Sequence, residues 1–368
     1  MSSVGVRIVV LGDLNLGDLR MQFGETDAIW GFLNDADVVL ANLEAPLAAS
    51  GTRADKPSTH RADPSTVHEL KRLGVDAVAL ANNHSMDYGT DGLVETLRAL
   101  DTVGISHAGA GLNREEAAAP ARLVTGGLNI AFLSFACTVP AGAAATEERP
   151  GIAPIRVTTH YVVDGAVVLE QPGSAPYVAT ELLEADVETA VSKVHYAAAN
   201  ADFVVVYLHW GVVPLWMPSI QGALADYQRP LGHRLVAAGA DLVVGTHSHV
   251  PQGVEVFAGK LIAYGLGDFV SHPSASASWD LSRPGPSYAA SPIQRRSWRP
   301  RSGALLSMTA EAHAIRRAEF VPYTLDDVVE PHRALGSDAQ AILRLMREAS
   351  PYEGDLAVDG DVGRIAVA

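Results

Sequence analysis

Short apolar runs alternate along this chain with segments of helical spacing. The runs VRIVVLGD, DVVLANLE and DAVALANN are rich in Val, Leu and Ala, which is typical of parallel strands buried on both faces. Helical patterns lie at residues 26–34, 64–74 and 90–103, and the rhythm resumes with helical patterns at 181–201 and 221–239. This alternation predicts βαβ units and an α/β fold.

Other stretches interrupt this rhythm. Gly, Pro and Ala clusters at 140–176 indicate an insertion or cap around a possible hairpin, and a second hairpin is predicted to turn at 258–259. A Ser-, Pro- and Arg-rich stretch at 271–302 is too long for a simple connector and is predicted to be a flexible flap loop. We expect one domain over residues 1–325, followed by a C-terminal helix and a weakly held tail over 326–368.

Side chains of the kinds that bind metals follow several apolar runs, in the segments GDLNLG, ANLE, ANNHSMD, LHWG and GTHSH. Ligands cluster at strand ends in open α/β sheets, so these side chains are predicted to meet there. Two adjacent divalent cations need a bridging carboxylate, neutral imidazoles and further oxygen ligands. The alternative is that these residues only cap and solvate the sheet. The candidate ligands are Asp13, Glu44, Asn83, His209, His247 and His249.

His84 directly follows the candidate ligand Asn83, so its side chain projects in another direction. This position suits a group that protonates a leaving group or stabilises charge in the transition state. Asp87, three residues later, is predicted to orient His84. A purely structural hydrogen bond is the alternative for His84.

Composition and charge limit the partners of this protein. A chain of 368 residues with 48% hydrophobic residues can bury a large core. Its net charge of −15 and its isoelectric point near 5.2 argue against binding to nucleic acid or to an anionic membrane.

No apolar run approaches about 20 residues, and the first residues lack the pattern of a signal peptide. With Cys137 as the single cysteine, we expect a cytoplasmic protein without a membrane segment. Its oligomeric state stays open.

An anionic substrate, whether small or polymeric, needs local positive charge in so acidic a chain. Arg295 and Arg296 belong to the segment RRSWRPR, and Lys56 and Arg61 lie in the loop after ANLEAPL. Guanidinium groups pair well with phosphate or carboxylate, so we predict that these residues contact substrate. For the arginine-rich segment, a solvated surface is the alternative.

The segments ANLEAPL, ALANNHSMDYG, LHWG, ADLVVGTHSHVPQGVEV and GKLIAYGLGDF together resemble the CapA family. These are bacterial capsule-synthesis proteins associated with poly-γ-glutamate, a branch of the calcineurin-like metallophosphoesterase superfamily. The resemblance covers about residues 6–270. It implies a four-layer α/β fold, with a β-sandwich of mixed sheets flanked by helices, and a dinuclear metal site. It gives the metal roles to the six candidate ligands and makes His84 the catalytic histidine.

The chain departs from the family pattern at several positions. The superfamily has histidine two residues after the first aspartate, where this chain has Asn15, a further candidate for substrate binding. Glu44 stands where ordinary phosphoesterases have aspartate, as is usual for the CapA branch. Val213 and Asp268 stand where family members commonly have glutamate and asparagine, and both differences point to a changed substrate. Whether Asn15 and Asp268 contact metal stays open.

The resemblance implies a dinuclear hydrolase in which metal-activated water attacks a phosphate ester. The expected cofactors are two divalent ions of Mn, Fe or Zn, among which these ligand types do not discriminate. One alternative is hydrolysis or acyl transfer at a γ-glutamyl or related amide, in poly-γ-glutamate or specialised-metabolite biosynthesis. Another is a non-catalytic scaffold in the assembly of a capsule polymer.

Overall fold

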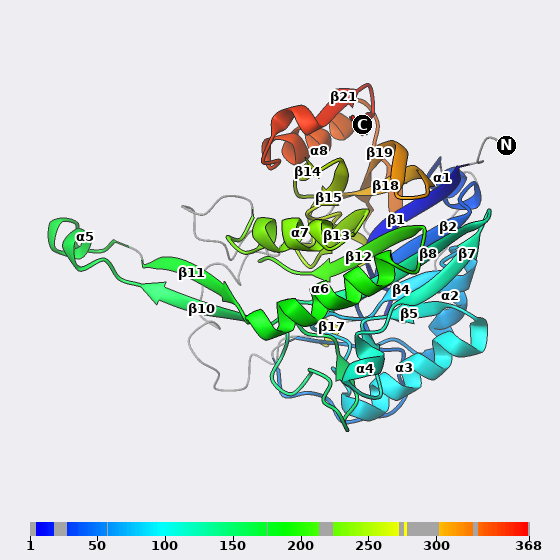
Figure 1. Ribbon diagram of the computed structural model, residues 1–368, viewed down its shortest axis with the longest axis horizontal. Coiled ribbons are helices and arrows are strands. Elements are labelled where there is room, and N and C mark those ends of the chain that lie inside the picture. Colours follow the sequence, from blue (N-terminus) through cyan, green and yellow to red (C-terminus); the bar gives the residue numbers. More distant parts are fainter. Residues whose placement is uncertain are drawn as a thin grey trace.

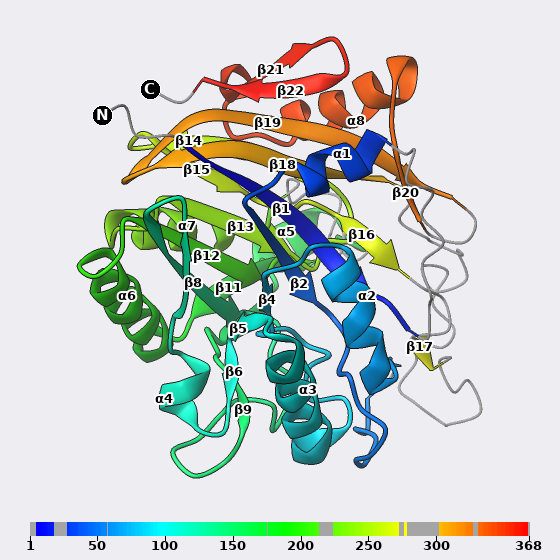
Figure 2. The same cartoon turned by 90° about the vertical axis from the view of Figure 1, so that its right-hand side faces the viewer.

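Two β-sheets packed face to face form the body of the protein, with helices on both outer sides (Figures 1 and 2). The computed structural model describes residues 5–17, 28–56, 58–174, 176–212, 224–271, 276–277, 302–326 and 330–366. The predicted helices are confirmed in these ranges. They are α1 (Ala28–Asn34), α2 (Val67–Arg72) after the short 3₁₀ helix η1 (Pro64–Thr66), α3 (Gly89–Val103), α6 (Glu184–Ala198), α7 (Gln228–Ala237) and α8 (Gly336–Glu348).

The larger sheet has mixed strand directions. Its strands in the described ranges run in the order β21, β22, β19, β18, β1, β2, β4, β5, with β16 beside β1 and β20 beside β19. The first four parallel members are β1 (Val6–Asn15), β2 (Val38–Leu43), β4 (Ala77–Ala79) and β5 (Ser106–Ala108). The remaining strands are β16 (Asp268–Ser271), β18 (Ser302–Glu311), β19 (Ala314–Leu325), β20 (Pro331–Arg333), β21 (Leu356–Asp359) and β22 (Val362–Ile365). One edge of β1 has two successive partners: its first half pairs with β18, and its last residues pair with β16.

The smaller sheet is mostly parallel. In the described ranges its strand order is β14, β15, β13, β12, β8, β7. These strands are β7 (Ala121–Thr125), β8 (Leu128–Ala136), β12 (Phe203–His209), β13 (Leu242–Thr246), β14 (Val254–Phe257) and β15 (Lys260–Ala263). The predicted hairpin at 258–259 is confirmed, since β14 and β15 pair through a turn in which both residues have positive φ.

Alternation along each central strand sends one set of apolar side chains between the sheets and the other set outward. On β1, Ile8 and Val10 join the core between the sheets, whereas Val9 and Leu11 pack beneath the outer helices. The same division on the smaller sheet builds a third cluster under α6 and α7. The result is the four-layer α/β sandwich of the metallophosphoesterase type that the resemblance implies.

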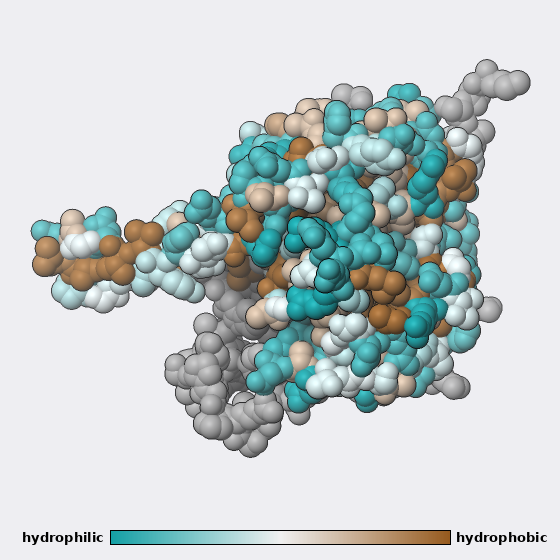
Figure 3. All heavy atoms as spheres, turned by 60° about the horizontal axis from the view of Figure 1, so that its bottom comes forward, coloured by the Kyte–Doolittle hydropathy of each residue, from teal (hydrophilic) through white to brown (hydrophobic). Residues whose placement is uncertain are grey.

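Most of the hairpin in the described residues lies within the stretch 140–176, where an insertion or cap is predicted, and it continues to residue 182. Strands β10 (Val157–Val162) and β11 (Tyr177–Leu182) form a two-stranded arm with α5 (Gly165–Glu170) at its tip. Figures 1 and 3 show this arm projecting outward, with apolar surface along it, so it is an extension and does not fold over the body as a cap. Exposed Tyr161, Val163 and Leu169 contribute to that surface.

Small elements complete the description of the fold. They are β3 (Thr59–His60), which pairs with β17 (Ser276–Ala277), β6 (Ala110–Gly111), which pairs with β9 (Gly151–Ile152), α4 (Arg114–Ala117), and the 3₁₀ helix η5 (Glu353–Asp355). The predicted flap at 271–302 lies almost entirely outside the described residues.

The C-terminal helix is present as α8, but the residues after it do not form the expected weakly held tail. After α8, strands β21 and β22 form a hairpin, and β22 pairs with β19. Leu356 and Ile365 are buried in the core between the sheets, together with Leu343 and Met346 of α8. This hairpin is hard to predict from the amino-acid sequence because its strands, LAVD and VGRI, are each only four residues long.

Candidate metal centre

The candidate ligands come from the ends of strands in both sheets. Asp13 lies near the end of β1, Glu44 directly follows β2, and His209 is the last residue of β12. His247 directly follows β13. Parallel strands whose ends meet at one edge therefore assemble this site, as expected for open α/β sheets.

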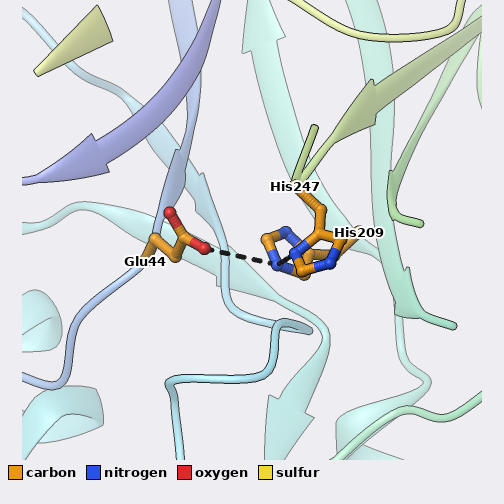
Figure 4. Close-up of side chains that lie close together, drawn as sticks. All are labelled: Glu44, His209 and His247. Atoms are coloured by element: carbon orange, nitrogen blue, oxygen red, sulfur yellow. Dashed lines mark hydrogen bonds and ion pairs between the residues drawn. The ribbon is translucent and has the colours of Figure 1, made fainter. Parts of the chain in front are cut away.

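The first ligand group consists of Glu44, His209 and His247, whose ligand atoms all lie within 4.8 Å of one another. Figure 4 shows the carboxylate and the two imidazoles converging. Nε2 of His209 lies 3.4 Å from Oε1 of Glu44 and 3.1 Å from Nδ1 of His247. The same Nε2 lies 2.7 Å from Oδ1 of Asn83, so the predicted amide ligand faces this group as well.

The second ligand group consists of Asp13, Glu44, His249 and Asp268, again within 4.8 Å of one another. Nδ1 of His249 lies 2.7 Å from Oδ1 of Asp268, 3.9 Å from Oδ2 of Asp13 and 3.8 Å from Oε2 of Glu44. Glu44 belongs to both groups and uses one oxygen toward each. A carboxylate placed in this way could bridge two cations.

Neighbouring groups fix the ligands in place. The Asn42 amide donates to Oδ1 of Asp13 at 2.6 Å, and the backbone N–H of His247 donates to Oδ2 of Asp13 at 3.0 Å. The side chain of Thr246 lies 2.9 Å from Nδ1 of His209, which leaves Nε2 of that ring to face the ligand group. Such contacts orient ligands and strengthen metal binding.

Two glycines allow the close approach that brings Asp13 beside Asp268. A Cβ atom on Gly12 would lie 1.8 Å from the carbonyl oxygen of Gly267, which excludes any larger residue at Gly12. Gly267 itself has φ of 80°. The backbone N–H of Asp13 donates to the Gly267 carbonyl, and Asp13 and Asp268 are register partners in parallel strands.

His247 and His249 both have left-handed backbones, with φ of 84° and 57°. Non-glycine residues rarely adopt this conformation, and it costs about 1 to 3 kcal/mol when the structure imposes it. The left-handed turns let two histidines only two residues apart reach different ligand groups. A continuing strand would have placed both on one face.

Charge is distributed unequally between the two groups. Burial, reinforced by the nearby histidines, holds the pKa of His209 well below its usual range and lowers the pKa of His247 to about 3, so both imidazoles are neutral. Burial raises the pKa of Asp13 to about 7, and burial beside Asp13 raises the pKa of Glu44 well above its usual value. Burial disfavours charge on His249, yet the adjacent carboxylates hold its pKa well above its usual range.

The buried acidic residues and the neutral imidazoles of this site suit the binding of a cation. Three carboxyl groups, of Asp13, Glu44 and Asp268, are buried together, which is costly unless positive charge neutralises them. Oε1 of Glu44 is fully buried and has no hydrogen-bond partner among the described residues. Neutral imidazoles and carboxylate oxygens are suitable ligands for divalent Mn, Fe or Zn.

Metal binding is expected to weaken as the pH falls below about 7. In the absence of a cation Asp13 holds a proton up to a pKa of about 7, and a cation must displace that proton. The apparent affinity should fall by about tenfold per pH unit for each proton released. Titration of Mn²⁺ at pH 6, 7 and 8 measures this slope, and a pH-independent affinity would contradict it.

Next to the ligand groups lies the predicted pair of His84 and Asp87. Nδ1 of His84 lies 2.7 Å from Oδ2 of Asp87, and both side chains are buried. Burial, with the cationic Lys56 and the His60 ring nearby, holds the pKa of His84 well below its usual range. Because an ionised Asp87 can only accept, the contact requires the tautomer of the neutral ring that carries its proton on Nδ1.

Lys56 and Asn15, predicted to bind substrate, are both engaged beside this pair. Nζ of Lys56 lies 2.5 Å from Oδ1 of Asp87 and also contacts the carbonyl oxygen of Asn83. Nδ2 of Asn15 lies 3.2 Å from Nδ1 of His60, whose ring centroid is 3.7 Å from that of His84. Both residues therefore line the same site, with Lys56 partly exposed and Asn15 buried.

Of the other predicted cationic contacts, the structure describes Arg61 alone. Arg61 is exposed, with its guanidinium 4.9 Å from the centre of the Tyr88 ring. Arg295 and Arg296 lie outside the described residues. Their role in binding substrate stays a prediction.

Two residues of this site were not identified by the sequence as members of it. The sequence leaves the role of Asp268 open, because the tripeptide Leu-Gly-Asp occurs at 11–13, 16–18 and 266–268 and only the first of these aspartates stands in a predicted ligand position. His60 carries no recognisable motif. Only the fold brings it beside His84.

The fold and the shared carboxylate define the class: an α/β sandwich of the metallophosphoesterase type with two adjoining candidate metal positions. Within this class, the chain belongs to the bacterial capsule synthesis protein PGA_cap family, whose sequence profile matches residues 7–273. The resemblance to the CapA family is thereby confirmed.

Curated relatives agree with this family. The chain is 30% identical over 275 residues to the capsule biosynthesis protein CapA of Bacillus anthracis, a match covering 72% of this chain and 59% of the relative. It is 35% identical over 260 residues to a probable polyglutamine synthesis accessory protein of Mycobacterium tuberculosis, covering 69% and 60%. It is 30% identical over 270 residues to the PGA biosynthesis protein CapA of Bacillus subtilis, covering 71% and 62%. The matches thus span about three fifths of these relatives.

None of the helices in the described ranges is both long and apolar enough to cross a membrane.

Proposed function

We propose that this protein is a dinuclear metal-dependent hydrolase acting on a phosphate ester. The observation that carries the proposal is the pair of ligand groups that share Glu44. Two divalent cations held there would polarise the bond under attack and supply an activated water. Two observations support a site built for ions: among the described residues the buried Oε1 of Glu44 accepts no hydrogen bond, and His247 and His249 have left-handed backbones.

Residues around the ligand groups would supply proton exchange and would orient the ligands. Asp87 accepts the Nδ1 proton of His84, which fixes the ring and leaves Nε2 to exchange a proton with the substrate. Lys56 holds Asp87 in position through its ion pair and adds positive charge beside the site. Asn42 and Thr246 keep the ligands Asp13 and His209 oriented.

A second candidate reaction is supported by the names of the relatives. Those names refer to capsule, PGA and polyglutamine synthesis, which points to a γ-glutamyl or related amide as the bond that is hydrolysed or transferred. An amide carbonyl would use the same ligands and the same His84. A non-catalytic accessory role in polymer assembly is the third possibility, and it requires no bound metal.

Metal content and turnover together separate these functions. We would measure metals in the purified protein and in Asp13→Ala and His247→Ala variants, then assay p-nitrophenyl phosphate and a γ-glutamyl anilide with added Mn²⁺. About two metals per chain, with turnover of one substrate that both variants lose, would support the hydrolase and identify its bond. A wild-type protein that binds no metal under any loading condition would refute it.

Replacing Asp87 by asparagine is expected to lower turnover without removing metal. The amide oxygen can still accept a hydrogen bond from Nδ1, but it has no negative charge to stabilise a protonated ring. The rate should therefore fall by about 100-fold or more while the metal content stays unchanged. Asp63→Asn is a suitable control, because its exposed carboxylate only caps η1. Loss of metal from Asp87→Asn would instead show a structural role for the pair.

A further inference from the structure

The two ligand groups differ in chemistry as well as in charge. The first group offers the shared Glu44 and two neutral imidazoles, with the Asn83 amide beside them. The second offers three carboxylates and the single imidazole of His249. Imidazole suits Zn or Fe, whereas several carboxylate oxygens suit harder cations such as Mn²⁺ or Mg²⁺.

Asp268 causes most of this difference. The residue is 2% exposed, and one of its carboxylate oxygens lies within 4.8 Å of the ligand atoms of Asp13, Glu44 and His249. Its backbone is anchored too, since the Tyr323 hydroxyl donates to the Asp268 carbonyl at 3.0 Å. Metal–ligand distances of about 2.0 to 2.2 Å place two ligands of one ion about 3 to 4 Å apart. Nδ1 of His249 lies 3.9 Å from Asp13 and 3.8 Å from Glu44, and it lies closer, at 2.7 Å, to Asp268.

We propose that Asp268 is a direct ligand, and that it makes the second position bind a hard, oxygen-preferring cation of the Mn²⁺ type before the first position fills. The proposal rests on the dinuclear centre proposed above. Two cations that share Glu44 repel each other, so the position with more carboxylates fills first. The two positions are therefore unequal in affinity and in metal preference.

A competing role for Asp268 is to orient His249 through its 2.7 Å contact with Nδ1. The two roles predict different consequences for Asp268→Asn. An amide oxygen still accepts a hydrogen bond from an imidazole N–H, but it brings no charge to a cation. A lost carboxylate ligand weakens Mn²⁺ binding more than Zn²⁺ binding, whereas a disturbed imidazole weakens Zn²⁺ at least as much.

The test is a titration of chelator-treated protein with Mn²⁺ and, separately, with Zn²⁺, followed by calorimetry and by the electron paramagnetic resonance of free Mn²⁺. The variants are Asp268→Asn and Asp268→Ser, compared with Asp76→Asn. Asp76 is a partly buried carboxylate that accepts from the Val39 amide at the opposite end of the strands. Thermal melts in chelator establish that each variant is folded.

We expect the wild-type protein and Asp76→Asn to bind two Mn²⁺ in two separate steps. In Asp268→Asn the tighter Mn²⁺ step should weaken by about 100-fold or more, with a smaller loss for Zn²⁺ and the weaker step retained. Unchanged Mn²⁺ binding, or equal losses for both metals, would overturn the role of Asp268 and leave the hydrolase proposal standing. A wild-type protein that binds neither metal would instead overturn the hydrolase proposal itself.

Discussion

Glu44→Gln is expected to have opposite effects on metal binding and on the stability of the metal-free protein. The glutamine has the same size, but its amide nitrogen cannot be a ligand, so it cannot bridge both ligand groups. Affinity for metal should fall by at least about 100-fold, and turnover should fall with it. In chelator at pH 8, however, the variant should melt at a higher temperature than the wild type, because it removes a charge whose burial raises its pKa.

The sign of this stability effect follows from linkage. A carboxyl group whose pKa is raised by folding destabilises the native state at pH values above its unfolded pKa. Glu95→Gln is the matched control, since Glu95 lies apart from the ligands and accepts from the backbone of Ala49 and Ser50. That variant should keep its metal and gain no stability in chelator. A lower melting temperature for Glu44→Gln in chelator would show that the carboxylate already has a stabilising partner within the protein.

Gly12→Ala is expected to destabilise the protein by about 4 kcal/mol or more. The added Cβ would meet the backbone oxygen of Gly267 at 1.8 Å, and neither strand can retreat without breaking the contact between Asp13 and the Gly267 carbonyl. Chemical denaturation of the metal-free protein measures the change in the free energy of unfolding. If the variant folds, its metal content should also fall, because Asp13 and Asp268 would be forced apart.

Gly31→Ala supplies the control for this substitution. Gly31 lies on the exposed face of α1, and a Cβ there would meet no atom within 4 Å. Alanine in a helix is favoured over glycine, so this variant should gain about 0.5 to 1 kcal/mol. Equal destabilisation by both substitutions would contradict the steric explanation.

The parts of the fold that the sequence predicts best are those determined by local pattern. Buried parallel strands such as β1, β12 and β13 are continuous apolar runs, and α3 is bounded by glycine at its end, so each could be located without tertiary information. The C-terminal strands β21 and β22 could not. These four-residue segments form strands because β22 pairs with β19, a tertiary contact that the local sequence does not report.

The site shows the same limit. Asp13, Glu44 and His247 follow strong strand patterns within recognisable motifs, so their proximity could be predicted. The contribution of Asp268 depends on its register with Asp13 across β1 and β16, about 255 residues apart in the chain, which no local pattern reports. His60 likewise reaches His84 through a loop whose path is set by tertiary contacts.

The order of strands in the larger sheet has a consequence for dissecting this protein. The family match ends at residue 273, but β18, which covers the first half of β1, begins at residue 302. A fragment cut at the end of the match would expose the backbone of β1 along an open edge and remove Leu306, Met308 and Phe320 from the core between the sheets. Such a fragment would be prone to aggregate, so the smallest autonomous unit that retains the ligands extends through the strands after residue 302.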